Sequence, residues 1–225
     1  MPYQLQWYDG KPTPWHAGKV VCVGRNYADH AKELNNPIPD KPLLFIKPST
    51  AIADIEQPLT LPSGQGEVHY EAEIALLVGE TIRNVSPQEA LKNMVGAGIA
   101  LDLTLRDLQS ELKQKGHPWE IAKAFDGSAP LSGFVPCETM GEEPVGIELI
   151  INGETRQKGF SDLMLTPIAE LISYISHIFT LEPGDIILTG TPAGVGPLNP
   201  GDKYSMHLLG KDGEARHSVT GCVQV

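Results

Sequence analysis

The sequence predicts a mixed, predominantly β fold with few helices, and three observations support this prediction. Short apolar runs typical of strands outnumber the segments with helical periodicity. The 23 glycines and 19 prolines among 225 residues exceed the usual combined share of about 12%, so turns are frequent. The few segments with helix start signals do not alternate regularly with the strand signals, which argues against a doubly wound α/β sheet.

Runs rich in β-branched and other apolar residues predict strands along the whole chain. These runs are Lys19–Val23, Leu43–Ile46, Tyr70–Val78, Ile99–Asp102, Ile147–Ile151, Asp185–Thr189, Tyr204–Leu209 and a C-terminal run to Val225. Asn152-Gly153 lies between two runs and predicts a type I′ hairpin. Gly210–Gly213 predicts a second tight turn.

Two helices have recognisable starts. Ser86 and Glu89 form a capping box around Pro87, a residue favoured at the first helical position. Thr166-Pro167 opens a second helix, whose apolar residues repeat at helical spacing from Ile168 to Phe179. The helical content expected from these signals is small.

Composition and charge limit the class of protein. We expect residues 1–18 to form a poorly patterned N-terminal segment and residues 19–225 to form one catalytic domain, because no linker or repeat divides them. With 17 Lys and Arg against 28 Asp and Glu, the net charge is −11, which argues against binding to nucleic acid or an anionic membrane. No apolar run approaches the ~20 residues of a membrane-spanning helix. Three cysteines without a Cys-x-x-Cys pair and an N-terminus without a secretory signal predict a cytoplasmic protein lacking disulfide bonds.

Three acidic residues form the first candidate site. On the predicted strand Tyr70–Val78, Glu71 and Glu73 face the same side about 7 Å apart, where two carboxylates repel each other unless a cation lies between them. Alternatively, both face water on an edge strand. Asp102 ends an apolar run and is either a third oxygen ligand or a cap that pairs with Arg106. Three carboxylates without imidazole or thiolate favour Mg²⁺ or Mn²⁺.

Two further pairs offer acid–base and anion-binding side chains. His30 and Glu33 stand three positions apart on a predicted short helix, where a carboxylate can orient an imidazole as a general base. An exposed ion pair is the alternative for these two residues. If Thr104 caps a helix, Arg106 and Gln109 share one face of it and can hold an anionic substrate.

Lys123 and the loop Thr189–Gly196 complete the candidates. Lys123 lies in a mostly apolar segment, so it is either a partly buried acid or charge stabiliser, or a surface lysine. The Gly-rich loop contains Thr191 and can bind a carboxylate through its amides and hydroxyls, or serve only as a tight connection.

Taken together, these segments resemble the fumarylacetoacetate hydrolase (FAH) family from about Lys19 to the C-terminus. The motifs that carry the resemblance are Val23–Tyr27 with His30 and Glu33, Leu44–Pro48, His69–Glu73, Leu101–Asp107, Lys123–Asp126, and Phe179–Asp185 followed by Thr189–Gly196. The short length resembles the acylpyruvase/oxaloacetate decarboxylase branch. The resemblance implies a β-roll of packed mixed sheets with a few short helices, assembled as a homodimer.

The resemblance also implies a site. Mg²⁺ or Mn²⁺ would be held by the positions that match Glu71, Glu73 and Asp102. His30 and Glu33 would form a catalytic dyad on a lid-like segment, and Lys123 would stabilise an enolate. The other positions expected to approach a small 2-oxo or 2,4-dioxo acid substrate are Arg25, Lys47, Arg106, Gln109 and Thr191.

The implied reaction is Mg²⁺-dependent hydrolysis of a C–C bond in acylpyruvates and other 2,4-dioxo acids, which yields pyruvate and a carboxylic acid. Decarboxylation and keto–enol tautomerisation of oxaloacetate are alternatives, because the same metal chelate of a 2-oxo acid supports them. A catalytically silent homologue that binds a 2-oxo acid is the alternative from another class.

Overall fold

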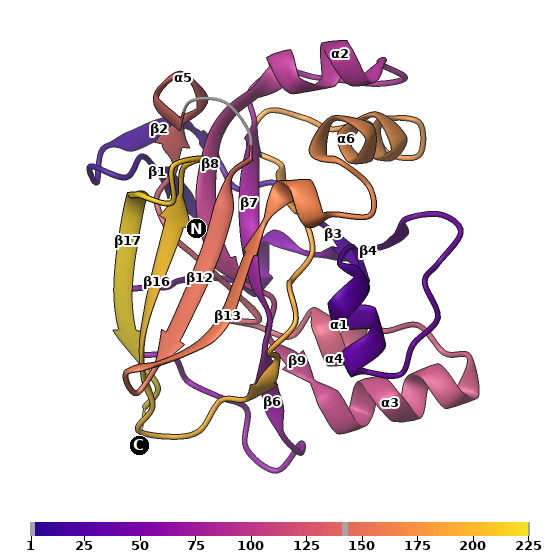
Figure 1. Ribbon diagram of the computed structural model, residues 1–225, viewed down its shortest axis with the longest axis vertical. Helices are drawn as coiled ribbons and strands as arrows, with labels where there is room; N and C mark the ends of the chain where they lie inside the picture. Colours follow the sequence, from indigo (N-terminus) through magenta and orange to yellow (C-terminus); the bar gives the residue numbers. More distant parts are fainter. Residues whose placement is uncertain (1–2, 141–143, 225) are drawn as a thin grey trace.

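An eight-stranded mixed sheet forms the centre of the computed structural model, which describes residues 3–140 and 144–224 (Figure 1). Residues 1–2 of the predicted N-terminal segment, and residues 141–143 and 225 of the predicted catalytic domain, lie outside the described residues. The sheet contains, in spatial order, β4 (Leu43–Lys47), β3 (Val20–Gly24), β14 (Ile186–Leu188), β7 (Ala72–Val78), β8 (Met94–Leu101), β10 (Ala129–Leu131) and β5 (Ile52–Asp54), with β11 (Val135–Pro136) also paired to β8. β14 runs parallel to β3, and β10 runs parallel to β5.

Smaller sheets surround the central one. A four-stranded antiparallel sheet consists of β13 (Glu154–Phe160), β12 (Gly146–Ile151), β16 (Lys203–Leu209) and β17 (Ala215–Cys222). A three-stranded sheet consists of β15 (Gly196–Pro197), β6 (Val68–Tyr70) and β9 (Thr104–Leu105), and a hairpin consists of β1 (Gln4–Gln6) and β2 (Pro12–His16).

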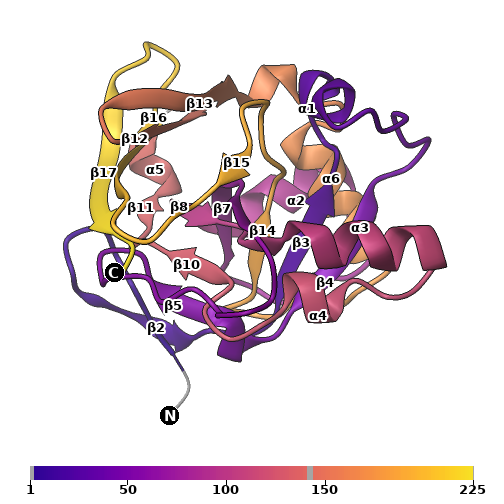
Figure 2. The same ribbon diagram turned by 90° about the horizontal axis from the view of Figure 1, so that it is seen from below.

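The helices are short and lie at the periphery. They are α1 (Ala28–Glu33), α2 (Pro87–Ala90), α3 (Arg106–Lys115), α4 (Glu120–Lys123), α5 (Cys137–Met140) and α6 (Ile168–Ser176), with 3-10 turns at Ser49–Ala51, Leu91–Asn93 and Ser161–Leu163. Figure 2 shows the four-stranded sheet on one side of the molecule and α1, α3 and α4 grouped on the other. The predicted mixed, predominantly β fold with few short helices is therefore confirmed.

Strand β7 is buried along its whole length because the sheet packs on both faces. Alternate residues of a strand point to opposite faces. Ile74 and Leu76 accordingly join the larger core, which also takes side chains from β12, β16 and α6. Ala75 and Leu77 join the smaller core, where Leu5 of the N-terminal hairpin packs. This double packing gives the residues of β7 a fixed place in the middle of the fold.

The structure differs from the predicted elements at two places near the acidic residues. The predicted strand Tyr70–Val78 is interrupted at Glu71, because its first part pairs with β9 and β15 and its second part pairs with β8 and β14. The predicted cap Thr104 belongs instead to β9, and helix α3 begins at Arg106 with Leu105 as its N-cap. Thr104 donates its hydroxyl to the carbonyl oxygen of Asp102 over 3.2 Å, so it does not cap the helix.

Other local predictions are confirmed. The capping box of Ser86 and Glu89 is present at the start of α2. Asn152 and Gly153 have φ angles of +52° and +84° and connect β12 to β13, as a type I′ hairpin requires. The three cysteines are free thiols. Within the described ranges, no helix is both long enough and apolar enough to cross a membrane. The domain boundary between residues 18 and 19 stays a prediction.

Candidate active site

The antiparallel pairing of β7 with β8 brings the three predicted acidic residues together. Ala72 stands opposite Leu101, so Glu71 and Asp102 lie side by side where the pairing ends. The N–H of Asp102 donates to the carbonyl oxygen of Glu71 over 2.8 Å and fixes this junction. One carboxylate oxygen from each of Glu71, Glu73 and Asp102 lies within 4.8 Å of the others, and all three residues are buried.

Two cationic side chains, buried Lys123 and partly buried Arg106, face this acidic triad of Glu71, Glu73 and Asp102. Lys123 at the end of α4 donates from Nζ to Glu71 Oε2 over 2.8 Å and to Asp102 Oδ2 over 2.7 Å. The guanidinium of Arg106, at the start of α3, forms an ion pair with Glu71 Oε1. Because buried charges are costly unless they are paired, these contacts hold the carboxylates in place.

Lys47 contacts the triad through Asp102 without lining the cavity. Its fully buried Nζ lies 2.8 Å from Asp102 Oδ1. The same ammonium donates to the carbonyl oxygens of Lys123 and Ser128, the latter over 2.9 Å. Lys47 does not line the cavity described below, although the sequence predicted that it approaches substrate. Its position suits a residue that orients Asp102.

Glu71 and Glu73 have opposite electrostatic environments. Burial raises the pKa of Glu73 well above its ordinary value, and the negative charges of Asp102 and Glu71 raise it further. Although burial also disfavours the charged form of Glu71, the cations Lys123 and Arg106 hold the pKa of Glu71 well below its ordinary value. Burial opposes the charged form of Lys123 as well, but Asp102 and Glu71 keep the pKa of Lys123 above its ordinary value.

The donor set fits a hard divalent cation. Among the described residues, Glu73 has no Lys or Arg partner within 4.0 Å, and its Oε2 accepts only the N–H of Gly190. Asp102 Oδ1 lies 2.8 Å from the Lys47 ammonium as an ion pair but has no hydrogen bond there, since Lys47 donates to carbonyl oxygens. A divalent cation would neutralise Glu73 and use the remaining lone pairs. Three carboxylates without sulfur or nitrogen donors can therefore hold Mg²⁺ or Mn²⁺.

The Gly-rich loop after β14 reaches the triad through its backbone and Thr191. The Thr191 hydroxyl donates to the carbonyl oxygen of Ala72 over 2.8 Å. Buried Gln157 on β13 donates from Nε2 to Thr191 Oγ1 over 2.7 Å and accepts the N–H of Ala72 at Oε1 over 2.9 Å. Gln157 therefore ties the loop to β7. Sequence reasoning missed this residue, because nothing in the polar sequence of β13 distinguishes it.

Helix α1 places His30 at the cavity with Glu33 behind it. His30 Nδ1 lies 3.4 Å from Glu33 Oε2, and Glu33 also accepts the N–H of Gly194 over 3.1 Å. Burial lowers the pKa of His30 below its ordinary value, although the negative charges of Glu71 and Glu33 oppose the shift. The imidazole is therefore neutral near pH 7 and can accept a proton.

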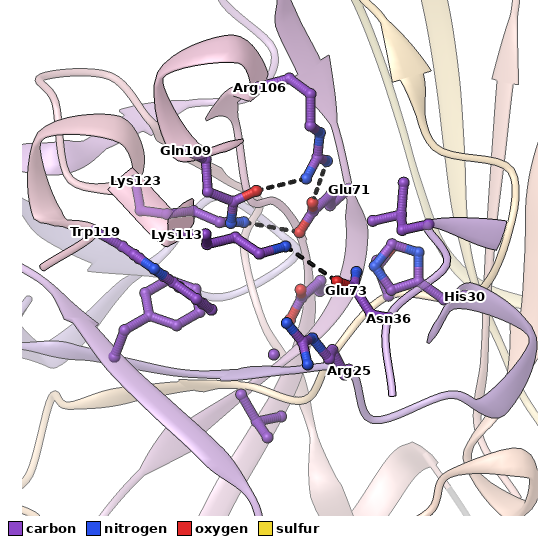
Figure 3. Close-up of a pocket in the computed structure, with 15 residues that line it drawn as sticks. Arg25, His30, Asn36, Glu71, Glu73, Arg106, Gln109, Lys113, Trp119 and Lys123 are labelled. Atoms are coloured by element: carbon purple, nitrogen blue, oxygen red, sulfur yellow. Dashed lines mark hydrogen bonds and ion pairs between the residues drawn. The ribbon is translucent and has the colours of Figure 1, made fainter. Parts of the chain in front are cut away.

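Several of these groups line one cavity between α1, α3, α4 and the end of the central sheet (Figure 3). Of the residues predicted from the sequence, the cavity is lined by Arg25, His30, Glu71, Glu73, Arg106, Gln109, Lys123 and Thr191. Glu33, Lys47 and Asp102 lie outside this lining. Sequence reasoning missed Val23, Gly24, Leu34, Asn36, Phe45, Lys113 and Trp119, which also line the cavity.

Arg106 is oriented from two sides within this cavity. Its Nη1 donates to Gln109 Oε1 over 2.8 Å, one turn further along α3, while its Nη2 faces Glu71. Figure 3 shows both contacts next to Lys123. The cavity thus combines two carboxylates of the buried acidic triad, a neutral imidazole and oriented cations, an arrangement suited to anionic oxygen-rich ligands.

Comparison with known proteins places this chain in a family. The family model described as fumarylacetoacetate (FAA) hydrolase C-terminal matches residues 19–220. The chain belongs to this fumarylacetoacetate hydrolase family. It is 47% identical over 220 residues to the oxaloacetate tautomerase YcgM of Escherichia coli, covering 97% of this chain and 98% of that protein. It is 44% identical over 198 residues to the mitochondrial oxaloacetate tautomerase FAHD1 of Homo sapiens, covering 87% and 90%.

Solved structures of FAH-family proteins share the fold. A family protein from Yersinia pestis superposes with a TM-score of 0.94 at 46% identity, covering 98% of this chain and 100% of that one. A fumarylpyruvate hydrolase from Pseudomonas aeruginosa, solved in complex with Mn²⁺ and pyruvate, superposes with a TM-score of 0.91 at 35% identity, covering 100% and 96%. The predicted resemblance to the FAH family is confirmed, and the chain is an enzyme of that family.

Proposed function

We propose that this FAH-family enzyme catalyses the keto–enol tautomerisation of oxaloacetate, with a divalent cation held by Glu71, Glu73 and Asp102. The observation that carries the proposal is the convergence of these buried carboxylates beside the neutral imidazole of His30. Tautomerisation was an alternative to the hydrolysis expected from the sequence. The comparisons favour that alternative, because the two tautomerases share 47% and 44% identity with this chain, against 35% for the fumarylpyruvate hydrolase.

The reaction moves one proton between the oxygen on C2 and the carbon C3. In the direction from enol to ketone, the 2-hydroxyl loses a proton and C3 gains one, so the atoms balance without water. Mg²⁺ or Mn²⁺, when bound, supplies a Lewis acid for the oxygens of the 2-oxo acid. His30 supplies a neutral imidazole that can carry the proton near neutral pH.

Cationic side chains stabilise the charge that develops on the substrate. Lys123 remains an ammonium because Asp102 and Glu71 raise its pKa, so it acts as a fixed positive charge beside the enolate oxygen. Arg106, oriented by Gln109 and Glu71, presents a guanidinium on the cavity wall for the C1 carboxylate. Thr191 also lines the cavity.

Hydrolysis of an acylpyruvate is the second candidate, and one contact favours it. The His30–Glu33 pair has the geometry to activate a water molecule, which tautomerisation does not need. The fumarylpyruvate hydrolase among the structural relatives is consistent with such a reaction. Decarboxylation of oxaloacetate on the same site remains a third outcome of the test.

Product analysis on two substrates tests the proposal. The purified protein is given Mg²⁺ and either the enol form of oxaloacetate or acetylpyruvate, and the enol, pyruvate and acetate are followed in time. We expect rapid Mg²⁺-dependent loss of the enol with little pyruvate. Cleavage of acetylpyruvate without acceleration of the tautomerisation would show a hydrolase instead. Rapid release of pyruvate from oxaloacetate would show a decarboxylase.

Three finer predictions accompany this function. We propose Mg²⁺ as the ion used in the cell, a homodimer as the assembly, and the cytoplasm as the location. Metal analysis of protein purified without added metal, light scattering of the purified chain, and fractionation of the source cells test these three predictions separately.

A further inference from the structure

The cavity carries more positive charge than its carboxylates balance. Arg106 and Lys123 face Glu71 and Asp102, as described above. Arg25 and Lys113 line the same cavity, but within the described ranges neither has a carboxylate partner within 4.0 Å. Neither charge is therefore paired in a salt bridge, and Glu73, the unpaired carboxylate of the same cavity, is the one that a bound metal would neutralise.

The contacts of these two cations are neutral. Lys113 donates from Nζ to Asn36 Oδ1 over 3.2 Å, and Arg25 donates from Nη1 to the carbonyl oxygen of Pro37 over 3.3 Å. Lys113 Nζ also lies 5.9 Å from the ring centroid of Trp119, which shields one side of the ammonium. Figure 3 shows Lys113 reaching from α3 across the cavity towards Asn36, with Arg25 below it.

Both residues carry a cost that a bound anion would offset. Both side chains are partly buried, and partial burial of an unpaired charge is unfavourable. Burial lowers the pKa of Lys113, and the positive charges of Arg25 and Arg106 lower it further. Arg25 also adopts a left-handed backbone conformation with φ of +60°, which is strained for a residue other than glycine. Strain and uncompensated charge at one cavity wall indicate a binding role.

We propose that Lys113 and Arg25 bind the second carboxylate of a dicarboxylic 2-oxo acid and select it over monocarboxylic 2-oxo acids. This inference rests on the proposed function, because it assumes that the acidic triad binds the 2-oxo acid end through a metal. The two ends of the cavity then have separate tasks. Arg106, Lys123 and the triad bind the end that reacts, and Lys113 with Arg25 binds the far carboxylate by charge-assisted hydrogen bonds.

A pair of ligands that differ only at the far end tests the proposal. In 2-oxobutyrate a methyl group replaces the second carboxylate of oxaloacetate. Binding of each ligand to the Mg²⁺-loaded protein is measured by calorimetry for the wild type, Lys113→Met and Lys113→Arg. We expect Lys113→Met to weaken oxaloacetate binding by about 10-fold to 100-fold, the usual effect of losing a charged hydrogen bond. Binding of 2-oxobutyrate should change less than about 2-fold, and Lys113→Arg should retain most of the affinity for oxaloacetate.

Lys115→Met is the matched control. Lys115 lies two positions along the same helix, is exposed, and pairs with Glu111 outside the cavity. Its replacement should leave both affinities unchanged. Equal weakening of both ligands by Lys113→Met, or no weakening of either, would overturn the inference.

The outcomes also separate this inference from the proposed function. Suppose that the wild type prefers oxaloacetate to 2-oxobutyrate, that Lys113→Met loses this preference, and that the wild type does not tautomerise oxaloacetate. The role of Lys113 in selection then holds, and the tautomerase proposal fails. If tautomerisation is fast and Lys113→Met does not change the preference, the tautomerase proposal holds and the role of Lys113 is disproved.

Discussion

The backbone N–H of Gly190 donates a hydrogen bond to Oε2 of Glu73 across 2.6 Å, although the two residues lie 117 positions apart in the chain. Gly190 has a φ angle of +95°, and a Cβ atom at this position would lie 2.7 Å from Cβ of Asn26. Only glycine fits such a conformation and such a close approach. The loop after β14 therefore fixes one carboxylate of the acidic triad through its main chain.

Replacement of this glycine should damage both the fold and the metal site. We expect Gly190→Ala to lower the free energy of unfolding by about 1–3 kcal/mol, because the alanine is strained and overpacked. The displaced N–H should also weaken Mn²⁺ binding, measured by calorimetry on the folded protein. Gly213→Ala is the control, because Gly213 has a φ of +79° but no atom within 4 Å of an added Cβ. Normal Mn²⁺ binding by Gly190→Ala would contradict this role of the loop.

Two substitutions in the acidic triad should separate metal binding from stability. Glu73→Gln removes a charge that has no cationic partner, and its amide oxygen can still accept the Gly190 N–H. We expect it to lose Mg²⁺ and Mn²⁺ binding and activity while the metal-free protein stays as stable as the wild type, or becomes more so. Asp102→Ala instead removes the common partner of Lys47 and Lys123.

The stability of Asp102→Ala should therefore fall. Breaking a buried ion pair on one side costs about 3–5 kcal/mol, because a buried charge is left uncompensated. Thermal and denaturant unfolding of both metal-free variants, beside metal titrations, measure the contrast. Tight Mn²⁺ binding by Glu73→Gln would remove Glu73 from the metal site.

The pH dependence of the reaction should report on His30. Burial lowers the pKa of His30 below its ordinary value, so the neutral form is present above that lowered pKa and kcat falls as the pH drops through it. Glu33→Gln removes a negative charge that favours the imidazolium. The pKa of His30 should then fall further, and the acid limb of the kcat profile should move to lower pH.

Glu33→Gln should also lower kcat, by about 10-fold to 100-fold, because the carboxylate no longer stabilises the protonated imidazole. Its amide oxygen can still accept the Gly194 N–H, so the loop contact should persist. An acid limb that moved to higher pH, or did not move, would show that another group controls it.

Replacement of Arg25 tests whether its unfavourable backbone conformation is retained for substrate binding. Its left-handed φ of +60° is unfavourable for arginine and acceptable for glycine. We expect Arg25→Gly to keep the unfolding temperature or raise it, while the KM for oxaloacetate increases about 10-fold or more through loss of the guanidinium. Kinetics and thermal unfolding of this variant measure the two effects. A stable variant with an unchanged KM would show that the strain has no binding role.

Most of the acidic site could be predicted because it depends on short-range patterns. Glu71 and Glu73 share a face over three residues, and Asp102 follows a recognisable apolar run. The interruption at Glu71 could not be predicted, because no glycine or proline marks a break between Tyr70 and Val78 and only the pairing with two different sheets divides the run. Likewise Thr104 is a typical cap residue, but pairing of β9 with β6 places it in a strand.

The residues that were missed come from long-range packing. Gln157 becomes part of the site only because β13 lies against the loop that carries Thr191. Lys113 sits on an amphipathic helix where a lysine ordinarily faces water, and Trp119 looks like an ordinary core residue. Their place at the cavity depends on how α3 and α4 pack against the central sheet, which no local spacing encodes.

In the metal-free protein, the ammonium group of Lys47 takes the place that a bound monovalent cation could occupy. Its ammonium is surrounded by carbonyl oxygens of Leu103, Lys123 and Ser128 and by Asp102, the kind of oxygen cage that elsewhere encloses potassium or sodium. A monovalent ion from solution would dissociate when the medium is diluted or the salt is exchanged. The Lys47 ammonium cannot dissociate, because it is covalently attached to the chain. The pocket should therefore be shaped before any divalent metal arrives, and its architecture should be indifferent to the choice of monovalent salt.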